Sequence, residues 1–165
     1  MKSYLQAYQE LVRCEFIDRD VVAKHVEQQL LIDEILPDTA SLFVITDIAS
    51  ATYPFVGSQL EVLSGYSIDE FYSAGYQLFI QCLHPEERDV IMLRVLPELV
   101  NYVATVPDEV RKSCQSQFNF RFKRKNGEYI NVLAQSYVLE VGQMGMVALA
   151  LSSIIQLETI EILPL

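Results

Sequence analysis

Cysteine is scarce in this sequence, and its distribution excludes a disulfide scaffold. The chain of 165 residues has three cysteines, Cys14, Cys82 and Cys114. They are odd in number and widely separated, with no CxxC pair and no metal-ligand spacing. We expect reduced thiols that serve as small buried apolar side chains in a cytosolic protein.

Export signals and membrane spans are also missing. The N-terminus, MKSYLQAYQE, is too polar for a signal peptide. The most apolar run, Met144 to Ile155, is about half as long as a membrane span. It is rich in small and β-branched residues, which predicts a buried strand. We expect a soluble cytoplasmic protein without membrane contacts.

Basic residues are few, which argues against a nucleic-acid partner. The chain has 12 Lys and Arg against 22 Asp and Glu, a net charge of −10. Binding to phosphate backbones depends on Lys and Arg. The one basic cluster, Lys123 to Lys125, precedes an Asn-Gly turn, and successive strand residues point to opposite faces. We therefore expect no nucleic-acid contact by this segment.

Groups for catalysis are scarce as well. The chain has only two histidines, His25 and His84, and neither stands in a pattern that predicts a catalytic triad. The segment Gly57 to Gly65 lacks the lysine and the spacing of a phosphate loop. Most acidic side chains near these segments fall at helix starts, where capping and the helix dipole explain them. We predict that the chain is not an enzyme and binds no metal.

The residues that are present predict a single α+β domain behind a helical extension. The chain is 51% hydrophobic, enough for a packed core. Residues 1–38 form the expected extension, with a first helix that Ser3 and Gln6 cap and a second helix from Asp20 to Pro37. The domain spans residues 39–155, and 156–165 form a C-terminal stub.

Two strands and three helices are expected in the first part of the domain. The strands are 41–50 and 52–58, with Pro54 marking the second as an edge or its first residue. Ser58 with Glu61, and Ser67 with Glu70, predict two capping boxes. Pro85 opens a longer helix, and Pro97 should kink or break it.

Three antiparallel strands are expected at 116–123, 128–140 and 144–154. Asn126-Gly127 predicts a two-residue type I′ turn. Counting outward then opposes Lys125 to Glu128, as an exposed ion pair, and Phe120 to Leu133. In this register one face would gather Phe118, Phe120, Phe122, Asn131, Leu133 and Gln135. Both faces carry apolar residues, so we expect both to be at least partly covered.

Three motifs together resemble those of PAS domains. They are LSGYSIDEF at 63–71, LHPEER at 83–88, and FNFRFKRKNGEYINVLAQ at 118–135. The likeness covers residues 39–155 and implies a five-stranded antiparallel sheet with short helices on one face. His84 then reads as a helix-start residue. The haem-binding histidine and the flavin-reactive cysteine signature of related sensors are absent, so no haem or flavin is expected.

The long segment before the hairpin is similar to sensor domains that precede LuxR-type helix-turn-helix regions in bacterial transcriptional regulators. The resemblance implies a signal-sensing or protein-interaction module whose DNA-binding output lies in a C-terminal region absent here. The signal, the output and the target genes stay open.

Two functional alternatives remain at this stage. In the first, an unidentified small molecule binds beside the sheet, and the candidate pocket residues are Phe118, Phe120, Phe122, Asn131, Leu133, Gln135 and Tyr137. Asn131 and Gln135 could equally bond backbone or water. In the second, the chain is a dimerisation module without a ligand; an enzyme is a distant third. Either way we expect a homodimer, with contacts from Leu5, Tyr8, Leu11, Val12, Val22 and Val26.

Overall fold

The computed structural model describes residues 1–12, 16–37 and 41–158. Cys14, the predicted boundary at residue 39 and most of the predicted C-terminal stub lie outside these ranges. Within them, no helix combines the length and the apolar character needed to cross a membrane.

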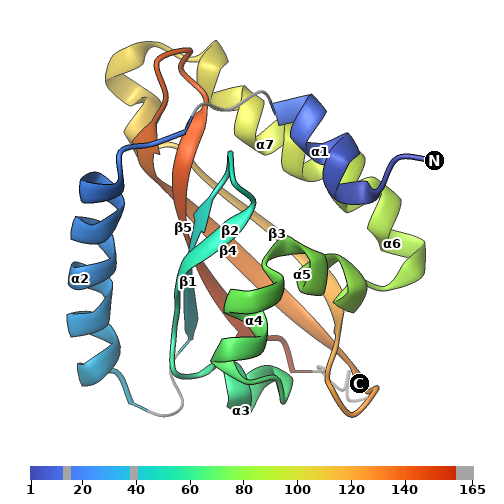
Figure 1. Ribbon diagram of the computed structural model, residues 1–165. Coiled ribbons are helices and arrows are strands. Elements are labelled where there is room, and N and C mark those ends of the chain that lie inside the picture. Colours follow the sequence, from blue (N-terminus) through green and yellow to red (C-terminus); the bar gives the residue numbers. More distant parts are fainter. Residues whose placement is uncertain (13–15, 38–40, 159–165) are drawn as a thin grey trace, which may run out of the picture.

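A five-stranded antiparallel sheet forms the centre of the molecule (Figure 1). Its strands are β1 (Leu42–Asp47), β2 (Thr52–Val56), β3 (Gln115–Lys123), β4 (Tyr129–Val141) and β5 (Val147–Gln156). They are arranged in the order β2-β1-β5-β4-β3. The predicted α+β class is confirmed. Pro54 lies on β2, an edge strand, where a missing backbone donor costs least.

The chain between β2 and β3 forms the helical layer over one face of the sheet, which we call the inner face (Figure 1). Its elements are α3 (Leu60–Ser64), α4 (Ile68–Ala74), α5 (Tyr76–Cys82), α6 (Pro85–Val90), the π-helical η1 (Ile91–Val95), α7 (Leu96–Tyr102), and the 3-10 turns η2 (Val103–Thr105) and η3 (Asp108–Ser113). Most are too short to be stable alone, so packing on the sheet must hold them.

One of the two capping boxes predicted in this layer is present. Ser67 accepts from the amide of Glu70, and the Glu70 carboxylate accepts from the amide of Ser67. The box predicted at Ser58 is wrong, because Gln59 is the N-cap of α3 and makes no side-chain cap bond. The Ser58 amide instead donates to the Asp33 carboxylate, at 3.1 Å. Tertiary contact displaced the local cap.

The sequence predicted a kink or a break at Pro97, and the break does not occur. Val95 and Leu96 both keep right-handed helical dihedrals. The five residues Ile91 to Val95 form a π-helical segment instead. A wider turn relieves the clash between a proline ring and the preceding carbonyl, and proline has no amide to leave unpaired.

The two N-terminal helices separate onto opposite faces of the sheet (Figure 1). The first, α1 (Tyr4–Val12), begins with the predicted capping box of Ser3 and Gln6. It packs against α5, η1 and α7. Tyr8 and Val12 are 0% and 1% exposed, so the prediction that they contact a second subunit is wrong. Leu5 is half-buried against the same core, and Leu11 is 44% exposed.

The second N-terminal helix, α2 (Arg19–Ile35), covers part of the outer face. Val22 and Val26 are half-buried against Ile45, Phe55 and Leu149 of the sheet. They therefore pack within the chain rather than presenting a free surface. The outer face is partly covered, as the mixed hydrophobic pattern predicted.

The register predicted for the hairpin between β3 and β4 is wrong by one residue. Phe122 pairs with Ile130, and Phe120 with Val132. The Arg124 amide donates to the Glu128 carbonyl at 2.8 Å, and Gly127, with a φ of 91°, donates to the Arg124 carbonyl at 2.9 Å. The loop thus has three residues, a tight turn followed by a left-handed glycine.

This loop also changes the ion pairs at the hairpin tip. Glu128 pairs with Arg124, at 3.3 Å, rather than with Lys125. Lys125 reaches α4 instead, where its Nζ bonds Glu70 at 2.9 Å, and its amide donates to the Ser64 carbonyl at 2.9 Å. The basic cluster therefore ties the hairpin to the helical layer.

Candidate ligand cavity

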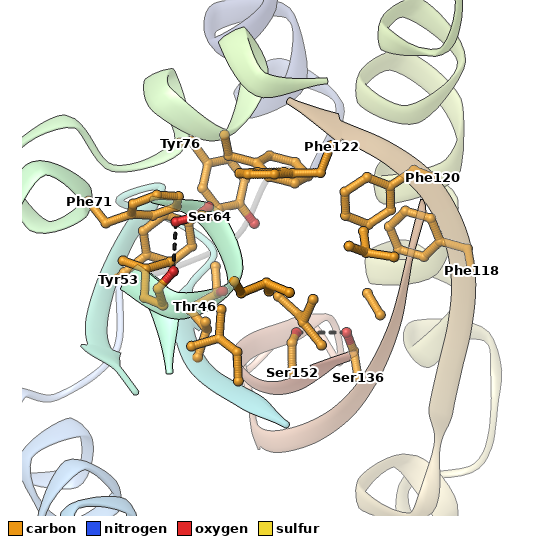
Figure 2. A pocket seen from close by; sticks show the side chains of 18 of the residues that line it. Thr46, Tyr53, Ser64, Phe71, Tyr76, Phe118, Phe120, Phe122, Ser136 and Ser152 are labelled. Atoms are coloured by element: carbon orange, nitrogen blue, oxygen red, sulfur yellow. Dashed lines mark hydrogen bonds between the residues drawn. The ribbon is translucent and has the colours of Figure 1, made fainter. Parts of the chain in front are cut away.

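A cavity of about 110 Å³ lies between the inner face of the sheet and the helical layer. Aromatic rings make up much of its wall (Figure 2). Tyr53 comes from β2, Phe71 from α4 and Tyr76 and Phe79 from α5; Phe118, Phe120 and Phe122 come from β3. The rings contact one another; for example, Phe79 packs edge to face on Phe120, with their ring centroids 5.8 Å apart. Such rings form a rigid apolar wall.

A second cavity, of about 140 Å³, adjoins the first beneath α7. It extends past Val100 and Val103 toward Val138 and Val147. Tyr8 of α1 borders it, so the N-terminal helix helps to close it. Six residues line both cavities: Thr46, Tyr76, Leu96, Phe118, Ser136 and Ser152.

Hydroxyl groups supply much of the polarity of the first cavity. Ser136 and Ser152 are cross-strand partners on β4 and β5, and their Oγ atoms lie 2.8 Å apart (Figure 2). Ser64 Oγ donates to the carbonyl of Leu60 at 2.7 Å. Thr46 stands on the neighbouring β1 and is buried. An apolar pocket with a few fixed polar groups is the usual form of a small-molecule site.

The electrostatics of the site favour uncharged groups. Among the residues that the structure describes, no charged side chain lines either cavity. Burial raises the pKa of the Tyr53 hydroxyl well above its ordinary value. Burial, together with a hydrogen bond to Cys82, raises the pKa of Tyr66 to about 12. Burial also raises the pKa of the Cys82 thiol. Tyr53 lines the first cavity, and Tyr66 and Cys82 belong to the surrounding core. All three pKa shifts indicate surroundings that solvate charge poorly.

Comparison with known proteins rests on structure alone, since no protein-family model and no curated protein matches this sequence. The chain is similar to the PAS/PAC sensor domain of a Marinobacter aquaeolei diguanylate cyclase, with a TM-score of 0.56 and 12% identity, over 70% of this chain and 94% of that one. It is similar to a Colwellia psychrerythraea PAS domain, with a TM-score of 0.56 and 14% identity, over 79% of this chain and 95% of that one.

A third similar structure is a LOV protein of Rhodobacter sphaeroides, with a TM-score of 0.55 and 14% identity, over 82% of this chain and 69% of that one. The fold is PAS-like. At these identities the likeness establishes the fold and leaves the ligand and the activity to other arguments.

Only some of the predicted pocket residues line the cavity. Phe118, Phe120 and Phe122 line it as expected. Asn131, Leu133 and Gln135 border neither cavity, because the one-residue register error put them on the wrong face. Gln135 instead bonds Gln115 across the outer face, at 3.3 Å. Tyr137 borders the second cavity only.

Several cavity residues were missed at the sequence level. Tyr53, Phe71 and Tyr76 come from short elements whose orientation depends on packing. Ser136 and Ser152 sit in strand patterns where small polar residues carry no distinctive signal. A correct hairpin register would have placed Ser136 on the same face as Phe118, because their partners alternate along β4.

The histidines occupy structural positions. His84 is the N-cap of α6, and its Nδ1 accepts from the Glu86 amide at 3.3 Å, as predicted. His25 lies on α2 and its Nε2 is 2.9 Å from a carboxylate oxygen of Glu140 on β4. In the described ranges no three His, Cys, Asp or Glu side chains are grouped as metal ligands. Cys82 is buried, as predicted, whereas Cys114 is only half-buried.

Proposed function

We propose that this chain is the signal-sensing module of a bacterial transcriptional regulator, acting in the cytoplasm. A small molecule would occupy the cavity between the sheet and the helical layer, and a DNA-binding output region outside these 165 residues would respond. The observation that carries the proposal is the aromatic-walled cavity with the paired hydroxyls of Ser136 and Ser152 at its sheet side.

The elements around the cavity suggest how occupancy could be transmitted. Leu96 lines both cavities and follows directly on the π-helical η1, and η1 and α7 contact α1. Tyr4 of α1 donates a hydrogen bond to Asp89 of α6. A ligand that displaces Leu96 would therefore shift α1 and α6. Only a ligand that binds one arrangement better than the other biases the equilibrium.

Self-association is the second part of the proposal. The outer face leaves several large apolar side chains exposed: Leu30, Leu31, Ile32 and Ile35 on α2, and Tyr129, Tyr137 and Ile155 on the sheet. Ile35 is 81% exposed and Leu31 is 66% exposed. Large apolar side chains left exposed in such number support an interface on this side of the molecule. A homodimer through this face would couple two cavities to one output.

This outer surface also supports a second candidate function, a dimerisation module that binds no ligand. The two candidates differ in what fills the cavity. Native protein purified under non-denaturing conditions and analysed by mass spectrometry should release a small molecule in near-stoichiometric amount. Protein that is ligand-free after gentle purification and gives no thermal shift with a library of small apolar compounds would favour the second candidate.

The structural neighbours give limited support for the wider setting. One is described as the sensor domain of a diguanylate cyclase and another as a sensory box histidine kinase/response regulator from Burkholderia thailandensis. Those names describe signalling proteins with different outputs. The LuxR-type setting proposed here rests on the likeness of the segment before the hairpin, and sequencing the full reading frame tests it directly.

A further inference from the structure

We infer that the two cavities together hold one elongated, uncharged ligand with a hydrogen-bonding group near the middle of its length. The inference deepens the proposed ligand-sensing function and rests on it.

The first step is that the cavities meet along a common seam. Of the six shared residues, Tyr76 and Leu96 belong to the helical layer and the other four to the sheet. The seam thus has both a roof and a floor. The two spaces are therefore adjacent and share part of their walls, so we treat them as halves of one site.

Three hydroxyls lie at this seam. Tyr53 and Ser64 line only the first cavity and Gln115 and Ser116 only the second, but Ser64 already donates to the Leu60 carbonyl and Gln115 accepts from Gln135. Ser136 and Ser152 bond each other at 2.8 Å, and the buried Thr46 stands on the next strand. Each hydroxyl has one donor and two acceptor positions. The bond between the serines uses one donor and one acceptor. The pair therefore retains a donor for a ligand carbonyl or ether and acceptors for a ligand hydroxyl.

The two ends of the site are dominated by apolar side chains. The end of the first cavity is lined by Leu42, Leu60, Phe122 and Val132, and the end of the second by Ile48, Val100, Val103 and Val147. Within residues 1–12, 16–37 and 41–158, no charged side chain lines either end. A buried charge without a partner is strongly unfavourable, so ligands with ionised ends are disfavoured.

The size of the site supports an occupant larger than water. The cavities measure about 110 and 140 Å³. Apolar cavities of this order stay dry and accept apolar molecules, and empty ones reduce stability. Two hydrocarbon arms joined by a polar centre would fill both ends and satisfy the serines.

Ketone position tests the inference in the unmodified protein. 6-Undecanone carries its carbonyl at the centre, 2-undecanone carries it near one end, and decanoate is a charged chain of similar length. The protein has no tryptophan and nine tyrosines, and Tyr53 and Tyr76 line the site, so tyrosine fluorescence reports binding. We expect 6-undecanone to bind about tenfold more tightly than 2-undecanone, the effect of one good hydrogen bond, and decanoate to bind most weakly.

The serine pair should be responsible for that preference. In the double variant Ser136→Ala, Ser152→Ala, the two ketones should bind equally. Equal affinities in the unmodified protein, or tighter binding of 2-undecanone, would overturn the inference.

Blocking each half separately tests whether one ligand spans both. Ala134 lines only the first cavity and Ala150 only the second. Ala134→Leu and Ala150→Leu should each weaken 6-undecanone binding by about tenfold or more, because overfilled space excludes a chain. A cooperative thermal transition checks that each variant is folded. If a variant does not fold, the comparison of 6-undecanone with 2-undecanone in the unmodified protein still tests the inference.

A short probe separates failure of the inference from failure of the proposed function. 3-Pentanone, followed by ligand-observed NMR, needs only the seam. If it binds while 6-undecanone does not, or if only one block affects 6-undecanone, the spanning ligand is wrong and the cavity still binds small molecules. If neither ketone binds and nothing co-purifies, the ligand-sensing function itself fails.

Discussion

The two faces of the central sheet are made by the same strands but are covered in different ways. The inner face is covered by the eight short elements between β2 and β3 and by α1, and it encloses the cavities. The outer face carries one long helix, α2, over β1, β2 and β5. Tyr129 and Tyr137 on β4 are left exposed on that side.

The difference between the faces underlies the two proposed roles, ligand binding on one face and self-association on the other. On the inner face, the short elements depend on tertiary packing, so they can respond to what fills the cavity. On the outer face, several large apolar side chains remain exposed, which is compatible with the proposed association with another chain. Four predictions test this division, from the largest expected effect to the smallest.

The largest effect is expected from charge placed on the inner face of the hairpin. Ile130 is buried on that face and its neighbour Asn131 is exposed on the other. Ile130→Asp should lose about 4 kcal/mol or more of unfolding free energy, or fail to fold, because it buries an unpaired carboxylate. Asn131→Asp should change it by about 0.5 kcal/mol or less. Urea titration followed by circular dichroism measures both. A larger loss for Asn131→Asp than for Ile130→Asp would mean that the hairpin has the two-residue turn and the register predicted from the sequence.

The next effect concerns α1, the helix on the inner side. Tyr8→Ala should cost about 3–5 kcal/mol, the usual range for a large aromatic side chain that is fully buried. Leu11→Ala, three residues further on and 44% exposed, is the matched control and should cost well under half as much. Similar losses for both would mean that α1 is not docked on the helical layer. Chemical denaturation at several protein concentrations keeps any dimer effect separate.

The third effect concerns the outer face. Leu31→Glu with Ile35→Glu should leave the unfolding free energy of the monomer within about 0.5 kcal/mol of the original, because both side chains are already in water. The same change should weaken self-association by at least about tenfold. Sedimentation velocity over a concentration series measures it. A monomer at high concentration before mutation would remove the proposed dimer, and unchanged association would move it to another surface.

The smallest effect is a pH dependence at the tie between α2 and the sheet. Burial acts to raise the pKa of Glu140, but hydrogen bonds from His25 and Lys112 outweigh it, so the pKa is lowered below its ordinary 4.5. The stabilisation is therefore fully present above pH 4.5 and is lost as pH falls through the lowered folded-state pKa. Glu140→Gln should flatten this part of the profile.

The size of that last effect should stay below about 1 kcal/mol, because the pair is partly exposed and water screens it. Thermal unfolding between pH 6 and pH 3, with Glu140→Gln alongside, measures the difference. A parallel pH profile for both proteins would show that the tie contributes nothing. Thermal curves for Asn131→Asp serve as a control for an unrelated carboxylate.

Short-range features were the ones that could be predicted from sequence. Ser67 and Glu70 cap each other because they are three residues apart, and Pro85 opens α6 because it needs no amide partner there. The alternation of Phe118, Phe120 and Phe122 fixed which of them share a face. All of these depend on neighbours within a few residues.

Most of the wrong predictions concern features that depend on distant partners. Asn126-Gly127 fits both a two-residue and a three-residue loop, and the anchoring of Lys125 on Ser64 and Glu70 goes with the longer one. Because the observed register differs from the predicted one by one residue, Asn131 and Gln135 lie outside the cavity and Ser136 lies in its wall. Similarly, the sequence pattern predicted Tyr8 to lie on an exposed apolar face of α1, but α1 packs against α5 and α7 and Tyr8 is buried.

By itself, the sequence determined the order of the elements, the caps at Ser3 and Ser67 and the alternation of each strand, because these depend on local backbone geometry and on nearest neighbours. Only the tertiary structure decided the hairpin register, the separation of α1 and α2 onto opposite faces, and the meeting of Thr46, Ser136 and Ser152 at one seam. These depend on contacts between residues far apart in the chain, and a side-chain pattern with several compatible partners cannot choose among them.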